Sequence, residues 1–312
     1  MSVNPKDSDS SAQVPADETL EDQISRTRHT LQIGGEKLRY TATAGTLVLK
    51  QEEEGDDKES KGEKAKASIF FIAYTKDAPQ GADEVEYRRQ RPVAFAFNGG
   101  PGSSSVWLHL GLLGPRRVRA MDENDKVLPP PYRLVDNQQS LLDETDLVFV
   151  DPVSTGFSRA VPGEKTDQFH GLKSDIETVG DLIRLYTTRY RRWSSPKFLI
   201  GESYGTTRAA GLSGYLQDRH GMYLNGIILV SAILNFQTAR FYPGNDLPFV
   251  LFLPTFAATA WYHRKLPEAL QADLHATLKK VEDFALGDYN FALMKGAALS
   301  GDARRQVVEK LV

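Results

Sequence analysis

The sequence of 312 residues contains no cysteine. This absence excludes disulfide bonds, a thiolate nucleophile and cysteine-rich metal sites. The chain does not open with a basic segment followed by an apolar core, and it has no run of about eighteen apolar residues, so it predicts neither a secretory signal nor a membrane-spanning helix. We therefore expect a cytoplasmic protein without a membrane partner. The alternative is a periplasmic or secreted protein whose signal is not included in this sequence.

The chain also lacks a strong excess of charge of either sign, with 38 basic residues, 41 acidic residues and a net charge of -3. Binding of nucleic acid needs a concentrated basic face, and none is evident. The basic cluster Arg189, Arg191 and Arg192 is predicted to form a solvated helix end. Nucleic acid is thus not an expected partner. The oligomeric state stays open, and a homodimer is one option.

The composition, 40% hydrophobic and 25% charged, is that of a globular protein large enough for a sizeable core. Residues 1–28 are rich in Ser, Asp, Glu and Gln and are predicted to be a disordered tail. Residues 51–67 form a mixed charge run, which predicts a solvated hairpin loop between strands at 46–50 and 68–74.

Beyond this hairpin, short apolar runs alternate with segments of helical period. Continuous apolar strands separated by helices indicate a parallel sheet covered on both faces, and hence an α/β fold. The core domain is expected to span residues 29–234, and the long helical segments at 235–312 predict a helical insertion. The expected strands lie at 91–98, 145–152, 197–202 and 224–234, and the expected helices lie near 176–190 and 207–219.

The stretch Gly201-Glu202-Ser203-Tyr204-Gly205 fits the pattern G-x-S-x-G and stands between a predicted strand and a predicted helix. In such a nucleophile elbow the serine takes a strained backbone conformation, for which glycine on either side leaves room. The helix that follows points its N-terminus at the reacting group and favours developing negative charge. The alternative is a glycine-bracketed turn that only packs a helix onto a sheet.

A second glycine-rich segment, "FNGGPGSSS" at residues 97–105, also follows a predicted strand. It offers several backbone N–H groups in a stiff loop with few side chains, which suits an oxyanion hole or an anion-binding nest. It lacks the G-K-[ST] ending of a phosphate-binding loop. A plain Gly-Pro turn is the alternative.

The motifs "NGGPGSSS", "VDPVSTGFS" and "GESYG", in this order, resemble the serine carboxypeptidase family of α/β-hydrolases. The resemblance runs from about Arg39 to at least Leu266. It implies a mostly parallel α/β-hydrolase sheet with flanking helices and a helical cap. It also implies hydrolysis of C-terminal peptide bonds through an acyl-enzyme, with no metal and no organic cofactor. The lack of cysteine and of a signal resembles the bacterial branch of the family.

The resemblance assigns a role to each residue of the two glycine-rich motifs. Ser203 would be the acylating nucleophile, and the backbone N–H groups of Gly100 and Tyr204 would form the oxyanion hole. The free C-terminal carboxylate of a peptide would be bound by Asn98, Gly99 and Glu202. Two facing carboxyl groups share a hydrogen bond only when one of them holds a proton. We therefore expect a lower peptide KM in mild acid than at alkaline pH.

Three positions depart from the family pattern. Leu112 stands where relatives usually hold a second glutamate, so an apolar side chain replaces the acid expected beside Glu202. Ser103 stands where many relatives carry a cysteine, which is consistent with a reducing compartment. Asp151 precedes the proline of "VDPVSTGFS", where a glutamine is usual.

A serine nucleophile needs a base, and α/β-hydrolases supply it in the order Ser, then Asp or Glu, then His. Three histidines follow Ser203. His220 ends the helix that begins beside the serine and should lie ~25 Å away. His263 and His275 fall in the helical region with no strand before them. We therefore predict that the chain is the N-terminal part of a longer protein. The last strands and the triad Asp and His would then lie beyond Val312, and the chain alone would be close to inactive.

Three alternatives stay open. An acyltransferase of the same family would use the same triad with an alcohol acceptor in place of water. A non-catalytic peptide-binding remnant would not react with a fluorophosphonate. A separate chain that supplies Asp and His would co-purify with this one.

Overall fold

The computed structural model describes residues 20–54, 60–122 and 126–311. These residues belong to two compact units, one reaching to Ala232 and the other beginning at Ile233. The boundary lies close to residue 235, where the sequence changes from strand-forming to helical segments.

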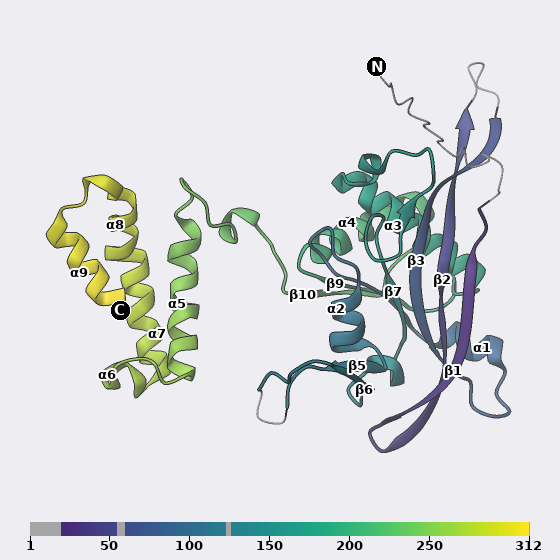
Figure 1. Ribbon diagram of the computed structural model, residues 1–312, viewed down its shortest axis with the longest axis horizontal. Coiled ribbons are helices and arrows are strands. Elements are labelled where there is room, and N and C mark those ends of the chain that lie inside the picture. The colour runs from purple at the N-terminus through teal and green to yellow at the C-terminus, as the bar shows by residue number, and fades with distance from the viewer. Residues whose placement is uncertain (1–19, 55–59, 123–125, 312) are drawn as a thin grey trace, which may run out of the picture. The chain divides into compact units, whose positions relative to one another are not determined.

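The first unit is built on a mixed sheet, whose described strands follow the order β1-β2-β3-β7-β4-β9-β10 (Figure 1). Three long strands, β1 to β3, form an antiparallel meander, and β7 joins β3 antiparallel. The other half, β7, β4, β9 and β10, is parallel. A short strand, β8, pairs with β3 off this path. The bounds are β1 Gln23–Ile33, β2 Glu36–Glu54, β3 Ser60–Lys76, β4 Val93–Phe97, β7 Asp146–Val150, β8 Arg159–Ala160, β9 Lys197–Glu202 and β10 Gly226–Val230.

The parallel strands form where the apolar runs predict them. Every residue of β4 and β7 is buried, as expected for central strands with helices on both sides. The strand β10 lies at the edge of the sheet, and its Ile227, Ile228 and Leu229 are each more than one-third exposed.

Helices cover both faces of the sheet. On one face, α3 (Leu172–Arg189) and α4 (Tyr204–His220) pack against the central strands. On the other face lie α2 (Val106–Leu108) and the π-helical turn His109–Leu113 that continues it. This unit also contains the helix α1 Glu84–Gln90 and the hairpin of β5 Arg116–Arg119 and β6 Arg133–Asp136.

Two predicted boundaries differ from the structure. The strand β1 begins at Gln23, inside the predicted tail 1–28, because it pairs with β2 through its backbone while its first eight side chains stay exposed and show no apolar alternation. Most of residues 51–67, which are predicted to be a hairpin loop, belong to paired strands, since β2 continues to Glu54 and β3 begins at Ser60. The rest of the tail, residues 1–19, and residues 55–59 of the loop lie outside the described residues.

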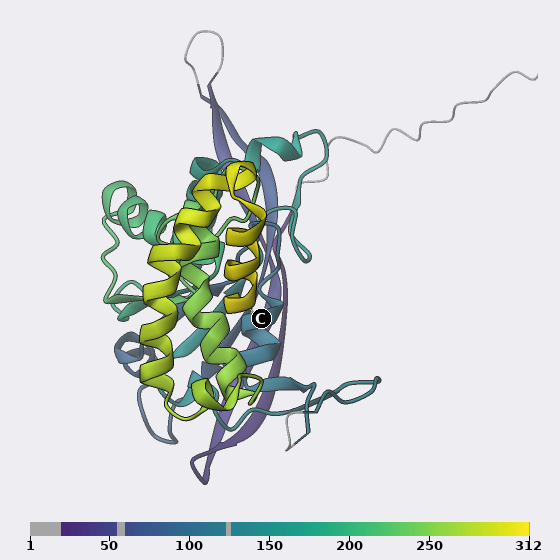
Figure 2. The ribbon, with the colours of Figure 1, turned by 90° about the vertical axis from the view of Figure 1, so that its left-hand side faces the viewer.

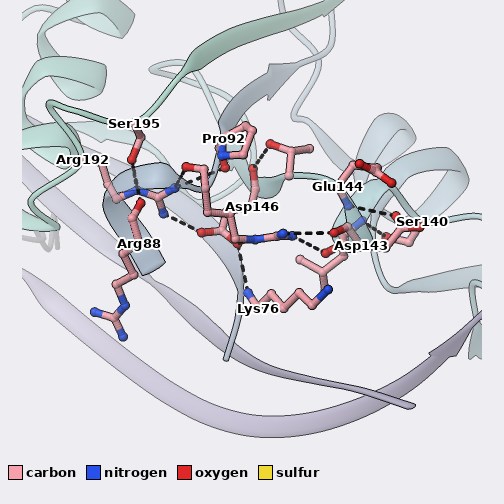
Figure 3. A network of polar contacts seen from close by, with 12 residues as sticks. Lys76, Arg88, Pro92, Ser140, Asp143, Glu144, Asp146, Arg192 and Ser195 are labelled. Atoms are coloured by element: carbon pink, nitrogen blue, oxygen red, sulfur yellow. Dashed lines mark hydrogen bonds and ion pairs between the residues drawn. The ribbon is translucent and has the colours of Figure 1, made fainter. Parts of the chain in front are cut away.

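The predicted solvated helix end is also wrong for Arg192, which is only 2% exposed. Its guanidinium and that of Arg91 both bind the buried carboxylate of Asp146, at 2.5 Å and 2.7 Å respectively (Figure 3). Arg192 also donates to the Ser195 hydroxyl and to the Arg91 carbonyl. This cluster joins the amino ends of β4 and β7.

The second unit is helical, as the sequence pattern from residue 235 predicts. Its helices α5 and α7 pack against each other (Figure 2). None of the helices in the described part of the chain has the length and hydrophobicity that crossing a membrane requires. The bounds are α5 Leu247–Tyr262, α6 Glu268–Gln271, α7 Leu274–Phe284, α8 Asn290–Lys295 and α9 Gly301–Leu311.

Candidate active site

Ser203 occupies the turn between β9 and α4 with φ 56° and ψ -122°, a strained conformation for a residue with a side chain. The flanking glycines are required by close backbone contacts. A Cβ on Gly201 would lie 2.0 Å from the Gly205 carbonyl oxygen, and one on Gly205 would lie 2.7 Å from the Phe97 carbonyl oxygen. The predicted elbow therefore forms, and it packs against the end of β4.

The glycine loop that follows β4 lies directly against this elbow. A Cβ on Gly99 would lie 2.4 Å from the Tyr204 nitrogen and 2.7 Å from the Glu202 carbonyl oxygen. Gly100 has φ +108°, which side chains rarely allow. The two motifs, about a hundred residues apart in the sequence, thus meet at the carboxyl ends of neighbouring parallel strands, the usual place for a ligand in such sheets.

A cavity of about 490 Å³ opens at this meeting point. Its size is typical of a small-molecule site. Five of the six residues that the sequence singled out line it: Asn98, Gly99, Gly100, Glu202 and Ser203. Its other lining residues are mainly apolar: Ser103, Trp107, Leu108, Leu112 and Val230.

Tyr204, the sixth predicted residue, does not line the cavity. Its ring lies beside the guanidinium of Arg208, 5.3 Å from the ring centroid. Its backbone amide opens α4, where amides have no acceptor within the helix, and it lies next to Gly99. The role predicted for Tyr204 uses only its backbone N–H. The position of Tyr204 at the elbow is compatible with that role, although its side chain lies outside the cavity lining.

Asn98 is held on three sides and is 1% exposed. Its Oδ1 accepts from the Leu108 amide at 3.0 Å, and its Nδ2 donates to Oε2 of Glu202 at 2.9 Å. Its backbone oxygen accepts from Arg208 at 2.7 Å. The side-chain amide therefore has a fixed orientation, with the NH2 group directed to Glu202.

Arg208 is a residue of this region that the sequence analysis missed. It is fully buried on α4, and its Nε donates to Oδ2 of Asp175 on α3 at 2.8 Å. The signal was present in the sequence, because Arg208 falls on the apolar stripe that α4 turns toward the sheet, one residue before Ala209 and four before Leu212. A charge on such a stripe indicates a specific buried partner.

The three departures from the family pattern all lie at or beside the cavity. Leu112 and Ser103 line it, and the Leu112 side chain is half exposed. Asp151 accepts from the Ser105 amide at 2.8 Å and so ties the loop after β7 to the glycine loop. Burial raises the pKa of the Asp151 carboxyl, against the lowering effect of hydrogen bonds from the Ser105 and Phe157 amides.

No histidine lines the cavity among the described residues. The four histidines of the first unit hydrogen-bond outside the cavity. The pairs are His29 with Thr27, His109 with Tyr74, His170 with Ser154 and His220 with Asp181. His220 lies at the far end of α4 from Ser203. His263 and His275 belong to the second unit. Among the residues that the structure describes, no cluster of three or more His, Asp or Glu side chains could hold a metal ion.

A sequence model of the serine carboxypeptidase family matches residues 60–277, more than half of the chain. The chain therefore belongs to the serine carboxypeptidase family of α/β-hydrolases, and the fold is a mixed α/β-hydrolase sheet with flanking helices. No curated protein sequence matches it.

Solved structures of esterases and of an α/β-hydrolase show distant similarity. An esterase from Pyrococcus furiosus is 15% identical, with 76% of this chain and 62% of that chain covered and a TM-score of 0.29. A peroxisomal α/β-hydrolase from Saccharomyces cerevisiae is 14% identical, with 85% and 62% covered and a TM-score of 0.31. A variant of the cell wall degrading esterase LipA from Xanthomonas oryzae is 10% identical, with 84% and 69% covered and a TM-score of 0.35.

The chain spans 62% of the length of the first two of these proteins.

Proposed function

We propose that the protein is a serine carboxypeptidase, which hydrolyses the C-terminal peptide bond of peptides through an acyl-enzyme on Ser203. One observation carries the proposal. Ser203, on its strained turn, shares a single cavity with Gly100 and with the hydrogen-bonded pair of Asn98 and Glu202. A serine hydroxyl, a glycine of the loop and a hydrogen-bonded polar pair thus border one cavity, which is the arrangement that the proposed reaction requires.

In the proposed reaction, the Ser203 hydroxyl oxygen attacks the carbonyl carbon of the last peptide bond. The oxyanion that forms is stabilised by the Gly100 and Tyr204 amides, each contributing about 2.7–4 kcal/mol to the transition state. The N-terminus of α4 adds a favourable dipole. The serine proton passes to a base and then to the leaving amine, and water releases the acyl group. Because no described residue of the cavity is a histidine, the proposal requires a base from elsewhere in the protein.

The free carboxylate of the substrate would be bound by Asn98, Gly99 and Glu202. The Asn98 Nδ2 has a second hydrogen beside the one given to Glu202, and Gly99 lines the cavity. Glu202 uses Oε2 for Asn98, which leaves Oε1 to share a proton with the substrate carboxyl group. Tighter peptide binding in mild acid follows from that shared proton.

Product analysis tests the proposal. The native protein, isolated from its own source, is incubated with an N-blocked tripeptide and with the same tripeptide as its C-terminal amide. The expected result is release of the C-terminal amino acid from the free acid and little release from the amide. Equal cleavage of both peptides contradicts a carboxypeptidase. Transfer of the acyl group to an added alcohol in preference to water would identify an acyltransferase instead.

A further inference from the structure

A buried cation that the proposed chemistry does not use contacts a residue of the candidate site. Arg208 is 0% exposed and contacts four neighbours. Its Nε binds Asp175, its Nη1 donates to the backbone oxygen of Asn98 at 2.7 Å, and its guanidinium lies over the rings of Tyr204 and Phe97. Its Nη2 has no hydrogen-bond partner among the described residues. Burying a guanidinium is costly, so a specific placement of this charge calls for an explanation.

The Asn98 oxygen that Arg208 binds and the Gly99 N–H are two ends of one planar peptide group. In a trans peptide these two groups point in opposite directions. Arg208 is fully buried where it binds this oxygen, and Gly99 lines the cavity. The N–H of Gly99 is therefore directed away from the arginine, in a residue that borders the ligand space.

A hydrogen bond from a cation to the oxygen of a peptide group also polarises that group and makes its N–H a stronger donor. The charge acts on the peptide N–H that the proposed function uses for the substrate carboxylate. Asp175 offsets part of this charge but fixes the guanidinium in place through Nε.

We propose that Arg208 is a positioning residue for carboxylate recognition. It holds the Asn98–Gly99 peptide group with its N–H turned into the cavity and strengthens that N–H toward a substrate anion. The inference rests on the proposed function, since it concerns the anion that the same cavity would bind. If Arg208 only linked α3 to α4, it would have no influence on whether the cavity prefers a free C-terminal carboxylate or a C-terminal amide.

The experiment measures this preference directly. In a Ser203→Ala background, which prevents turnover, dissociation constants are measured by fluorescence titration for dansyl-Phe-Leu and for its C-terminal amide. Leucine is chosen for the last residue because the cavity has apolar walls formed by Trp107, Leu108, Leu112 and Val230. The ratio of the amide dissociation constant to the acid dissociation constant reports recognition of the carboxylate.

Arg208→Met is expected to lower this ratio about tenfold, the factor expected when a charge-assisted hydrogen bond is weakened. Arg208→Lys, which keeps the charge, should recover part of it. The amide constant should change by less than about twofold. The double variant Arg208→Met/Asp175→Leu replaces the buried pair by apolar side chains, so that folding does not depend on an uncompensated carboxylate. Its ratio should equal that of Arg208→Met.

The matched control is Arg192→Met, which removes another buried guanidinium at the opposite end of the sheet and should leave the ratio unchanged. An unchanged ratio in the Arg208 double variant, or an equal weakening of both peptides, overturns the role of Arg208 and leaves the proposed function standing. If the Ser203→Ala protein itself does not distinguish acid from amide, carboxylate recognition fails, and the role of Arg208 fails with it.

Discussion

The two ends of the parallel strands carry opposite kinds of polar cluster. At the amino ends, the carboxylate of Asp146 accepts hydrogen bonds from both Arg91 and Arg192. Every nitrogen of these two guanidiniums donates a hydrogen bond. At the carboxyl ends, Ser203 and Gly100 hold conformations with positive φ around a cavity. At the amino ends of the strands the polar groups hydrogen-bond to one another, whereas at the carboxyl ends polar groups line a cavity.

This difference separates stability from function within one sheet. Strain and open hydrogen-bonding groups persist only where the surrounding structure imposes them, and they gather at functional sites. A closed charge network such as that of Asp146 fixes strand ends and chain connections. The variants below are expected to act on one end without the other.

The largest effect is expected at the amino ends. Asp146→Ala would leave two buried guanidiniums without their carboxylate, and loss of one partner of a buried pair costs about 3–5 kcal/mol of unfolding free energy. Urea denaturation followed by tryptophan fluorescence measures it. At temperatures where the variant is folded, its preference for the acid over the amide peptide should be unchanged. A changed preference would show that the two ends are coupled.

His109 predicts a pH effect on stability. Burial lowers the pKa of His109 from 6.5 to about 4 in the folded protein. Between these values the unfolded chain binds a proton that the folded protein does not, so stability is full above pH 6.5 and falls as the pH drops toward 4. The loss is up to about 3 kcal/mol. His109→Gln, which can still bond the Tyr74 hydroxyl, should show a smaller fall over this range in parallel urea titrations. Equal slopes for both proteins would contradict the assignment.

Gly99→Ala should damage the carboxyl end itself. The new Cβ would meet the backbone of Tyr204 at 2.4 Å and that of Glu202 at 2.7 Å, and neither can move without opening the elbow. We expect a loss of about 1–3 kcal/mol in unfolding free energy and loss of binding of dansyl-Phe-Leu. Gly102→Ala is the control in the same loop, because a Cβ there has no atom within 4 Å. Equal behaviour of the two variants would argue against the close packing of loop and elbow.

The smallest effect is a gain. Ser203→Gly removes the cost of a positive φ and should raise the unfolding free energy by about 1–2 kcal/mol. Ser203→Ala keeps its Cβ and should leave stability nearly unchanged. Thermal denaturation of the two variants side by side measures the difference. No difference between them would mean that the elbow stores no strain.

The parts of the fold that the sequence predicted are those whose signal is local. Apolar runs predict β4, β7, β9 and β10, and the spacing of glycines predicts both loops of the site. The start of β1 was missed because its exposed side chains carry no alternation, and its pairing depends on a neighbouring strand. Arg192 was wrongly predicted to be solvated because its partner Asp146 lies 46 residues away in the sequence. The apolar stripe of α4 indicates a buried partner for Arg208, but it does not identify Asp175, which is 33 residues away.

The proposed reaction depends on the Ser203 hydroxyl facing the glycine-loop amides as a nucleophile. The direct measurement is reaction of the native protein with a fluorophosphonate, followed by tandem mass spectrometry of the modified peptide. We expect a single adduct on Ser203, absent from Ser203→Ala and strongly reduced in Gly99→Ala. Failure of the native protein to react, or an adduct on another serine, would contradict it.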